Sequence, residues 1–219
     1  MTTATLPDDL TELSSIIMAA QAHLKHRALA QQPDIWSLIK GQEAAKRAII
    51  VAAVQGHSMI LIGRPHTSKT MLVLAAAQLG VAAVEVCIPA NQIDNPHNWQ
   101  VMYDRMLKRH AKDISRASIY AEVPDVPTRV MLKPWYGETL SQAADRVSKA
   151  GGLPPETLDD LSKSLLQQAV TELQIPPGRI SDVISVARSI AALDHSDHIQ
   201  IQHVAESVQY WPERILSNR

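Results

Sequence analysis

The chain has 219 residues, 46% of them hydrophobic, and its 21 basic side chains nearly balance its 22 acidic ones. This composition indicates a folded protein and excludes a disordered chain, a basic nucleic-acid coat protein and an acidic tail protein. No apolar run reaches the roughly 18 residues of a membrane span, and residues 1–10 lack the basic and apolar character of a signal peptide. We therefore expect a cytoplasmic protein without a membrane partner. The single cysteine, Cys87, excludes a disulfide framework, and we expect its thiol to be buried and unreactive.

Apolar periodicity predicts alternating helices and short strands in the first 123 residues. Helices are expected over residues 10–31, 42–55, 70–79 and 99–115, strands over residues 57–62, 82–88 and 117–123, and a loop over residues 89–98. The run at 59–62 is continuously apolar, which is typical of a strand buried on both faces of a parallel sheet. Gly56 is expected to end the helix before it.

The last part of the chain is predicted to be wholly helical. Helices are expected over residues 139–149, 155–173, 178–193 and 200–215. Three prolines between residues 124 and 138 indicate a linker before them. We predict four segments: an N-terminal helix in 1–35, an α/β domain in 36–123, a linker in 124–138 and an all-helical domain in 139–219. Trp99, Trp135 and Trp211 are expected to be packing anchors, because the chain has no Phe.

The sequence GRPHTSKT, at residues 63–70, follows a predicted strand and opens a predicted helix. In that context a loop presents its backbone N–H groups and a helix N-terminus to phosphate groups. We expect Lys69 to reach the outer phosphates and the Thr70 hydroxyl to lie beside Mg²⁺. The predicted nucleotide-binding residues are Gly63, His66, Thr67, Ser68, Lys69 and Thr70. The alternative is an ordinary strand-to-helix turn.

One residue departs from the phosphate-loop pattern G-x-x-x-x-G-K-[ST]. Ser68 stands where the pattern has its second glycine. A residue other than glycine held at positive φ costs roughly 1–3 kcal/mol. We therefore expect an altered loop or weaker binding.

The motifs of residues 39–72 resemble the opening of the magnesium chelatase subunit I and ComM-type AAA+ ATPases. That family has G-Q-x-x-A-K-R-A, G-H-x-x-x-L-x-G and G-P-P-G-[ST]-G-K-[ST] in this order. The matching residues are Gly41, Gln42, Ala45, Lys46, Arg47, Ala48, Gly56, His57, Gly63, Pro65, Thr67, Lys69 and Thr70, whereas His66 and Ser68 replace glycines. The similarity resumes at residues 116–127, 137–147 and 178–210. It implies an α/β fold, with a truncated P-loop AAA+-like parallel sheet domain followed by an all-helical lid, and ATP and Mg²⁺ as cofactors.

A part of the family pattern is missing. The family has an acidic Walker B motif and a polar sensor strand between the loop lysine and an arginine that Arg116 matches. Only 46 residues separate Lys69 from Arg116, and no apolar strand there is followed by an acidic pair. Asn91 and Asp94 are weak candidates for a metal or sensor group. Because phosphoryl transfer needs a held metal and a positioned water, we expect slow or no ATP hydrolysis.

Two arginines match family roles. The resemblance implies that Arg116 points at the nucleotide of a neighbouring subunit and that Arg179, in the lid, contacts the phosphate of its own subunit. An ordinary surface arginine is the alternative for each. Arg116 also shares a predicted helix face with Arg105, Lys108, Arg109 and Lys112. This face could bind a DNA backbone or an acidic partner, although a solvated face is the simpler interpretation.

Three histidines, His195, His198 and His203, lie close together near the C-terminus, and we interpret them as part of a polar turn rather than a metal site. Three candidate functions remain. The first is an ATP-binding protein with degraded hydrolysis machinery, which associates with itself or with a complete AAA+ subunit in a chelatase-like or DNA-processing context. The second is an interaction scaffold that keeps the fold without binding nucleotide. The third is a slow ATPase whose acidic groups come from elsewhere.

Overall fold

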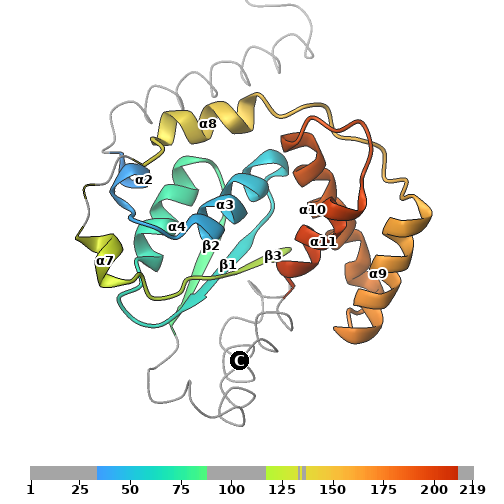
Figure 1. Ribbon diagram of the computed structural model, residues 1–219, viewed down its shortest axis with the longest axis horizontal. Coiled ribbons are helices and arrows are strands. Elements are labelled where there is room, and N and C mark those ends of the chain that lie inside the picture. The colour runs from blue at the N-terminus through green and yellow to red at the C-terminus, as the bar shows by residue number, and fades with distance from the viewer. Residues whose placement is uncertain (1–33, 88–116, 133, 135–136, 212–219) are drawn as a thin grey trace, which may run out of the picture. The chain divides into compact units, whose positions relative to one another are not determined.

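The computed structural model describes residues 34–87, 117–132, 134 and 137–211, and everything below concerns these residues (Figure 1). From Ile35 onward the chain forms one compact unit. The predicted helices at 10–31 and 99–115 and the loop at 89–98 lie outside the described residues. No described helix combines the length and apolarity that a membrane span requires.

Within the described residues, a parallel sheet has the strand order β2–β1–β3 (Figure 1). Its strands are β1 (Met59–Gly63), β2 (Ala83–Cys87) and β3 (Ile119–Glu122). Met59 pairs with Ala83 on one side and with Ile119 on the other. All five residues of β1 are buried, which explains why this strand is a continuous apolar run instead of an alternating one. The predicted parallel α/β sheet is confirmed.

Helices α3 (Glu43–Gln55) and α4 (Lys69–Gln78) pack against this sheet, α3 on β1 and β3, and α4 on β1 and β2. As predicted, α3 ends at Gly56, whose φ of 71° lies in the left-handed region that favours glycine. Three shorter helices are α2 (Ile35–Leu38), α7 (Thr128–Met131) and α8 (Leu140–Ser148). The helix α8, which is the first helix after the predicted linker, packs on α2 and α3 and so contacts the α/β part.

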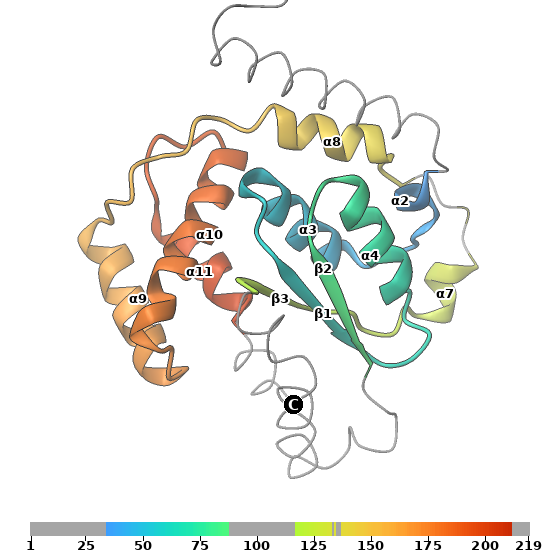
Figure 2. The same cartoon turned by 180° about the vertical axis from the view of Figure 1, so that it is seen from behind.

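The C-terminal helices form the predicted all-helical part (Figures 1 and 2). They are α9 (Asp160–Glu172), the 3₁₀ turn η2 (Pro177–Arg179), α10 (Ile180–Leu193) and α11 (Ile201–Gln209). Their shared core consists of Leu166, Ile175, Val183, Ala187, Ile199, Val204 and Trp211. Trp211 is the packing anchor that the sequence predicts, whereas Trp99 and Trp135 lie outside the described residues. The helix α10 also packs against α3, which joins the two parts.

One sequence-based expectation about the sheet is wrong. Cys87 is exposed, not buried. It is the last residue of β2, an edge strand of the described sheet, and it follows the buried Val86. Because successive side chains of a strand point to opposite faces, the thiol points away from the side that Val86 buries.

Candidate functional site

The loop between β1 and α4 holds two residues other than glycine in the left-handed backbone region. His66 and Ser68 have φ values of 66° and 67°. Residues other than glycine rarely adopt this left-handed region. These are the two positions where the related motif has glycine. At these two positions the backbone keeps a conformation that glycine adopts easily, and each residue carries a strain of roughly 1–3 kcal/mol.

Lys69 is the most unusual charged residue of this loop. Its side chain is only 3% exposed, at the first position of α4. The ammonium donates hydrogen bonds to the Arg64 carbonyl at 2.5 Å and to the Thr67 hydroxyl at 3.3 Å. Both partners are neutral oxygens, and no acidic side chain pairs with Lys69 among the described residues. A buried cation without a counter-ion is costly, so this position is suited to receive an anion.

The start of α4 adds to this preference for an anion. Ser68 is the N-cap residue of α4, but its side chain makes no capping hydrogen bond. The first N–H groups of a helix have no partner within the helix, and the helix dipole places partial positive charge there. Backbone N–H groups and the Lys69 ammonium thus converge on one end of α4. Together they have the chemistry of a phosphate-binding site.

Neighbouring segments hold the loop in place. The buried Gln42 side chain donates hydrogen bonds to the Thr67 carbonyl at 3.3 Å and to the Pro124 carbonyl at 2.7 Å. At the end of β1, a Cβ added to Gly63 would lie 2.3 Å from the Val123 carbonyl oxygen. The loop is therefore packed tightly against the segment that follows β3, and Gly63 is needed for that close approach.

The carboxylate of Glu85, which no sequence motif identifies, lies beside Thr70. The Thr70 hydroxyl donates a hydrogen bond to Glu85 Oε2 at 2.8 Å. Glu85 lies in the middle of β2, where it pairs with Leu61 of β1. The Walker B pattern is an apolar strand followed by an acidic pair, and a single acid inside a strand does not satisfy that pattern. The only sequence signal is a glutamate between two valines, in a strand that is otherwise apolar.

The structure does not bring Arg179 to the loop. Its guanidinium forms an ion pair with Asp182 at 2.9 Å, donates a hydrogen bond to the Ala117 carbonyl and lies over the Trp211 ring. Ala117 precedes β3, whereas Lys69 follows β1, and the two strands are parallel. Arg179 and Lys69 therefore lie at opposite ends of the sheet. The contact of Arg179 with the phosphate of its own subunit stays a prediction, without support from this arrangement.

An ion-pair network joins α3 to α11. Arg47 donates two hydrogen bonds to the Glu206 carboxylate, at 3.0 and 3.2 Å, and lies 3.5 Å from Asp194. The Tyr210 hydroxyl donates to the same carboxylate at 2.8 Å. Burial and the neighbouring Glu206 charge raise the pKa of Tyr210, so it stays a neutral donor. Arg47 belongs to the matched G-Q-x-x-A-K-R-A motif, and its structural role is to attach the helical part to the α/β part.

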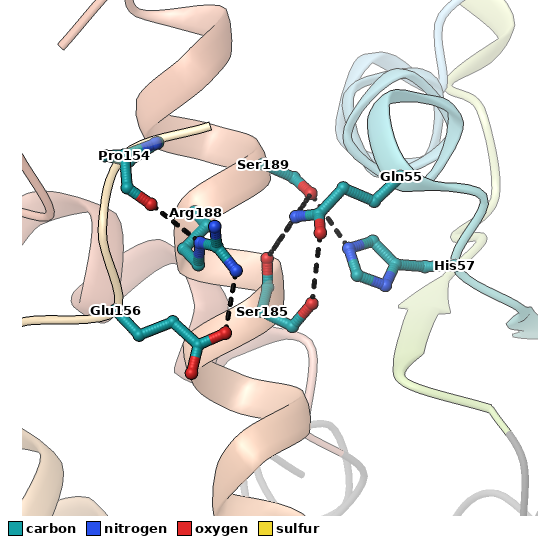
Figure 3. Close-up of polar contacts among 7 residues, drawn as sticks. All are labelled: Gln55, His57, Pro154, Glu156, Ser185, Arg188 and Ser189. Atoms are coloured by element: carbon teal, nitrogen blue, oxygen red, sulfur yellow. Dashed lines mark hydrogen bonds and ion pairs between the residues drawn. The ribbon is translucent and has the colours of Figure 1, made fainter. Parts of the chain in front are cut away.

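A second junction lies at the end of α3 (Figure 3). Gln55 Nε2 donates to the Ser185 carbonyl at 2.8 Å and to Ser189 Oγ at 2.7 Å. His57 Nε2 lies 2.9 Å from the same Ser189 hydroxyl. Burial lowers the pKa of His57, although the Asp182 charge and a backbone hydrogen bond oppose that shift. A neutral imidazole can accept the serine proton, so the folded state favours the uncharged form.

Arg188, on α10, fixes the connection between α8 and α9 (Figure 3). Its guanidinium donates to the Pro154 carbonyl at 2.8 Å and to Glu156 Oε1 at 2.7 Å.

Of the histidines interpreted as a polar turn, His203 is 1% exposed and its Nδ1 accepts a hydrogen bond from the Gln200 N–H at 2.9 Å. This contact caps the start of α11.

Arg105, Lys108, Arg109, Lys112, Arg116, Asn91 and Asp94 lie outside the described residues. The possible arginine contact with a neighbouring subunit and the basic helix face therefore stay predictions.

Comparison with known families agrees with the geometry of the loop and the helical part. Residues 35–115 match the model of the magnesium chelatase subunit ChlI family, and residues 140–211 match the model of the ChlI C-terminal domain. A search of curated proteins gave no match. The two matched stretches occur in the order of the family and together cover more than half of the chain. The chain therefore belongs to the magnesium chelatase subunit I-like family of AAA+ proteins.

Proposed function

We propose that the chain binds ATP with Mg²⁺ at the loop of residues 63–70, hydrolyses it slowly or not at all, and uses the bound nucleotide to control its association. The partner is a second copy of the chain or a complete AAA+ subunit. The setting is metal chelation, as the family name suggests, or DNA processing. Nucleotide binding is the step on which the other parts of the proposal depend.

The buried Lys69 ammonium carries the proposal. It has neutral oxygens as partners in the described part of the chain, and it lies at a helix start whose N-cap side chain does not cap it. A phosphate group would supply the missing negative charge and accept the N–H groups of the loop. Thr70 follows directly, and its hydroxyl oxygen is the type of ligand that Mg²⁺ accepts. These residues fit a magnesium–nucleotide complex.

Slow hydrolysis is proposed because of the missing acidic motif. Phosphoryl transfer needs a carboxylate for the metal and a group that orients the attacking water. The sequence between Lys69 and Arg116 has no apolar run followed by an acidic pair. A protein that binds ATP under these conditions would hold it for a long time, which suits a switch in assembly better than a motor. Arg116 would then act on the nucleotide of a neighbour in a mixed ring.

A binding titration tests the central step. A fluorescent ATP analogue with Mg²⁺ is titrated into the wild type, Lys69→Met and Lys163→Met. Lys163 lies on the exposed face of α9 and serves as the matched control. We expect the wild type and the control to bind alike and Lys69→Met to lose at least about tenfold in affinity, since removing one charge-assisted contact costs 1.5–3 kcal/mol.

Two further measurements address the rest of the proposal. Light scattering with and without the analogue should show a larger assembly when nucleotide is bound, for the chain alone or mixed with a complete AAA+ relative. Phosphate release should not exceed that of Lys69→Met. If the wild type binds no analogue, the interaction scaffold becomes the better function, and the strained His66 and Ser68 would then mark a loop that has lost its ligand. Steady phosphate release above the variant would instead favour the slow ATPase.

A further inference from the structure

Two unneutralised charges of opposite sign lie near the start of α4. The Lys69 ammonium has no acidic partner, and the Glu85 carboxylate has the Thr70 hydroxyl as its hydrogen-bond partner and no basic one, among the residues described. Lys69 and Glu85 do not form an ion pair with each other. A bound anion would neutralise Lys69, and a bound cation would neutralise Glu85. A magnesium–nucleotide complex supplies the anion and the cation together.

The position of Glu85 follows from the sheet. The strand β2 pairs directly with β1, and this register sets Glu85 opposite Leu61. The helix α4 packs against β2, which brings Thr70 of its first turn to 2.8 Å from the glutamate. The side chain of Glu85 is half-buried, so its carboxylate is partly removed from water but still within reach of a ligand at the loop.

The chemistry of the pair suits a hard divalent cation. Mg²⁺ prefers carboxylate and hydroxyl oxygens, keeps several waters and takes the rest of its ligands from phosphates. A threonine hydroxyl has one proton and two lone pairs, so Thr70 can donate to Glu85 while its oxygen faces the cation. In phosphate-loop enzymes an acidic side chain completes this site. Here the usual acidic motif is missing from the sequence.

We propose that Glu85 supplies the carboxylate of the magnesium site, in contact with the cation or with one of its waters, and so takes over metal binding from the missing motif. This proposal rests on the proposed binding of ATP. A single carboxylate beside Thr70 holds the metal but leaves no second acid to orient a water, which agrees with binding without rapid hydrolysis. Glu85 lies inside the strand β2, whereas the acids of the missing motif follow the end of a strand.

The test separates metal dependence from nucleotide binding. The fluorescent ATP analogue is titrated in Mg²⁺ and in EDTA into the wild type, Glu85→Gln and Glu172→Gln, an exposed glutamate on α9 that serves as the control. We expect Mg²⁺ to strengthen binding about tenfold or more in the wild type and the control, as is typical for groups that support a metal. In Glu85→Gln the affinity in EDTA is kept or improved, because a negative charge near the phosphates is gone, and the effect of Mg²⁺ falls to less than threefold.

A spectroscopic measurement gives a readout that does not depend on activity. Electron paramagnetic resonance with Mn²⁺ in place of Mg²⁺ should show immobilised Mn²⁺ in the wild type with ATP and much less in Glu85→Gln. Glu85→Asp provides a second variant, because its shorter carboxylate leaves more room. We expect the affinity ratio of Ca²⁺ to Mg²⁺ to rise in this variant, which a purely structural glutamate would not cause.

The outcomes of these experiments are distinct. If wild type binds the analogue in neither Mg²⁺ nor EDTA, both proposals are wrong. If the wild type and Glu85→Gln bind with the same Mg²⁺ dependence and equal Mn²⁺ immobilisation, ATP binding stands and the assignment of Glu85 is overturned. An unchanged ratio of Ca²⁺ to Mg²⁺ in Glu85→Asp also counts against the assignment. Circular dichroism of each variant checks that the fold is intact.

Discussion

Arg47 and Glu206 lie 159 residues apart in the sequence and form a two-point ion pair between α3 and α11. Each side chain is only 28% exposed. Removing one partner leaves a half-buried charge with a weaker contact, which is Asp194 for Arg47 and the Tyr210 hydroxyl for Glu206. We therefore expect Arg47→Met or Glu206→Gln to lower the free energy of unfolding by about 1.5–3 kcal/mol. Urea unfolding of both single variants and the double variant measures this effect, and we expect the double variant to lose less than the sum of the two.

A surface pair provides the control for this prediction. Lys163 and Asp160 also form an ion pair, but both side chains are mainly exposed. Removing Lys163 should therefore cause no measurable change in stability. Strictly additive losses at Arg47 and Glu206 would show that the two side chains are not coupled, and that this ion pair does not help to attach the helical part.

Gly63 is expected to be intolerant of any side chain. A Cβ at this position would lie 2.3 Å from the Val123 carbonyl oxygen, and backbone cannot easily move away. We expect Gly63→Ala to lower the free energy of unfolding by about 2 kcal/mol or more, because overpacking against fixed backbone forces a shift of β1 or of the loop.

The matched control is Gly152→Ala. No atom lies within 4 Å of a Cβ added to Gly152. Its effect on stability should stay within about 0.5 kcal/mol, as for most surface substitutions. Differential scanning calorimetry of the two variants and the wild type compares them directly. Equal melting temperatures for Gly63→Ala and Gly152→Ala would mean that β1 and the segment after β3 are not in close contact.

Periodicity predicted the elements around the loop because each depends on local sequence. The continuous apolar run of β1 and the alanine-rich face of α3 each give a pattern that one element explains. Predicted strand and helix limits agree with the structure to within a few residues for β1, α4 and α10. The four-residue helices α2 and α7 were not predicted, since a single turn is too short to show a period.

The contacts between elements could not be predicted from local patterns. The Thr70–Glu85 hydrogen bond depends on β2 pairing with β1, and the sequences of the two strands do not specify that they pair with each other. The position of Arg179 shows the same limit. Its place at the start of a helix was predicted, but which end of the sheet it meets depends on how α10 packs against α3. A motif specifies residue types and their spacing along the chain, and these distances are not contained in it.

Ser68 is expected to be a destabilising residue at its position. Its φ of 67° lies in the left-handed region, which glycine adopts without the steric cost of a Cβ. We expect Ser68→Gly to raise the free energy of unfolding by about 1 kcal/mol. Chemical denaturation of the wild type and the variant measures the change.

The opposite result is expected for a serine in an ordinary helix. Ser164 is exposed in the middle of α9, so Ser164→Gly should lower stability by about 1 kcal/mol through the poor helix propensity of glycine. The two substitutions are chemically identical, and only the backbone differs. A loss of stability in both variants would contradict the left-handed conformation at Ser68.

Stability is expected to fall in mild acid because of His57. Burial lowers the pKa of this histidine below its usual value of about 6.5, so the unfolded chain binds its proton at a higher pH than the folded chain does. Stability contributed by His57 is therefore complete above about pH 6.5 and decreases as the pH falls towards the folded pKa, by up to about 1.4 kcal/mol per pH unit. Burial also lowers the pKa of His203, which adds to the same slope.

The substitution His57→Gln isolates the contribution of this histidine. Glutamine has no titrating group, so the decrease in stability between about pH 6.5 and 5 should become shallower than in the wild type, with the remaining slope due in part to His203. Above pH 7 the two curves should run parallel, because His57 is neutral in both the folded and the unfolded wild type. Urea unfolding at half-unit pH intervals measures both curves. If the decrease is instead steeper in His57→Gln than in the wild type, the protonated imidazole is favoured at the Ser189 junction, contrary to the effect of burial on His57.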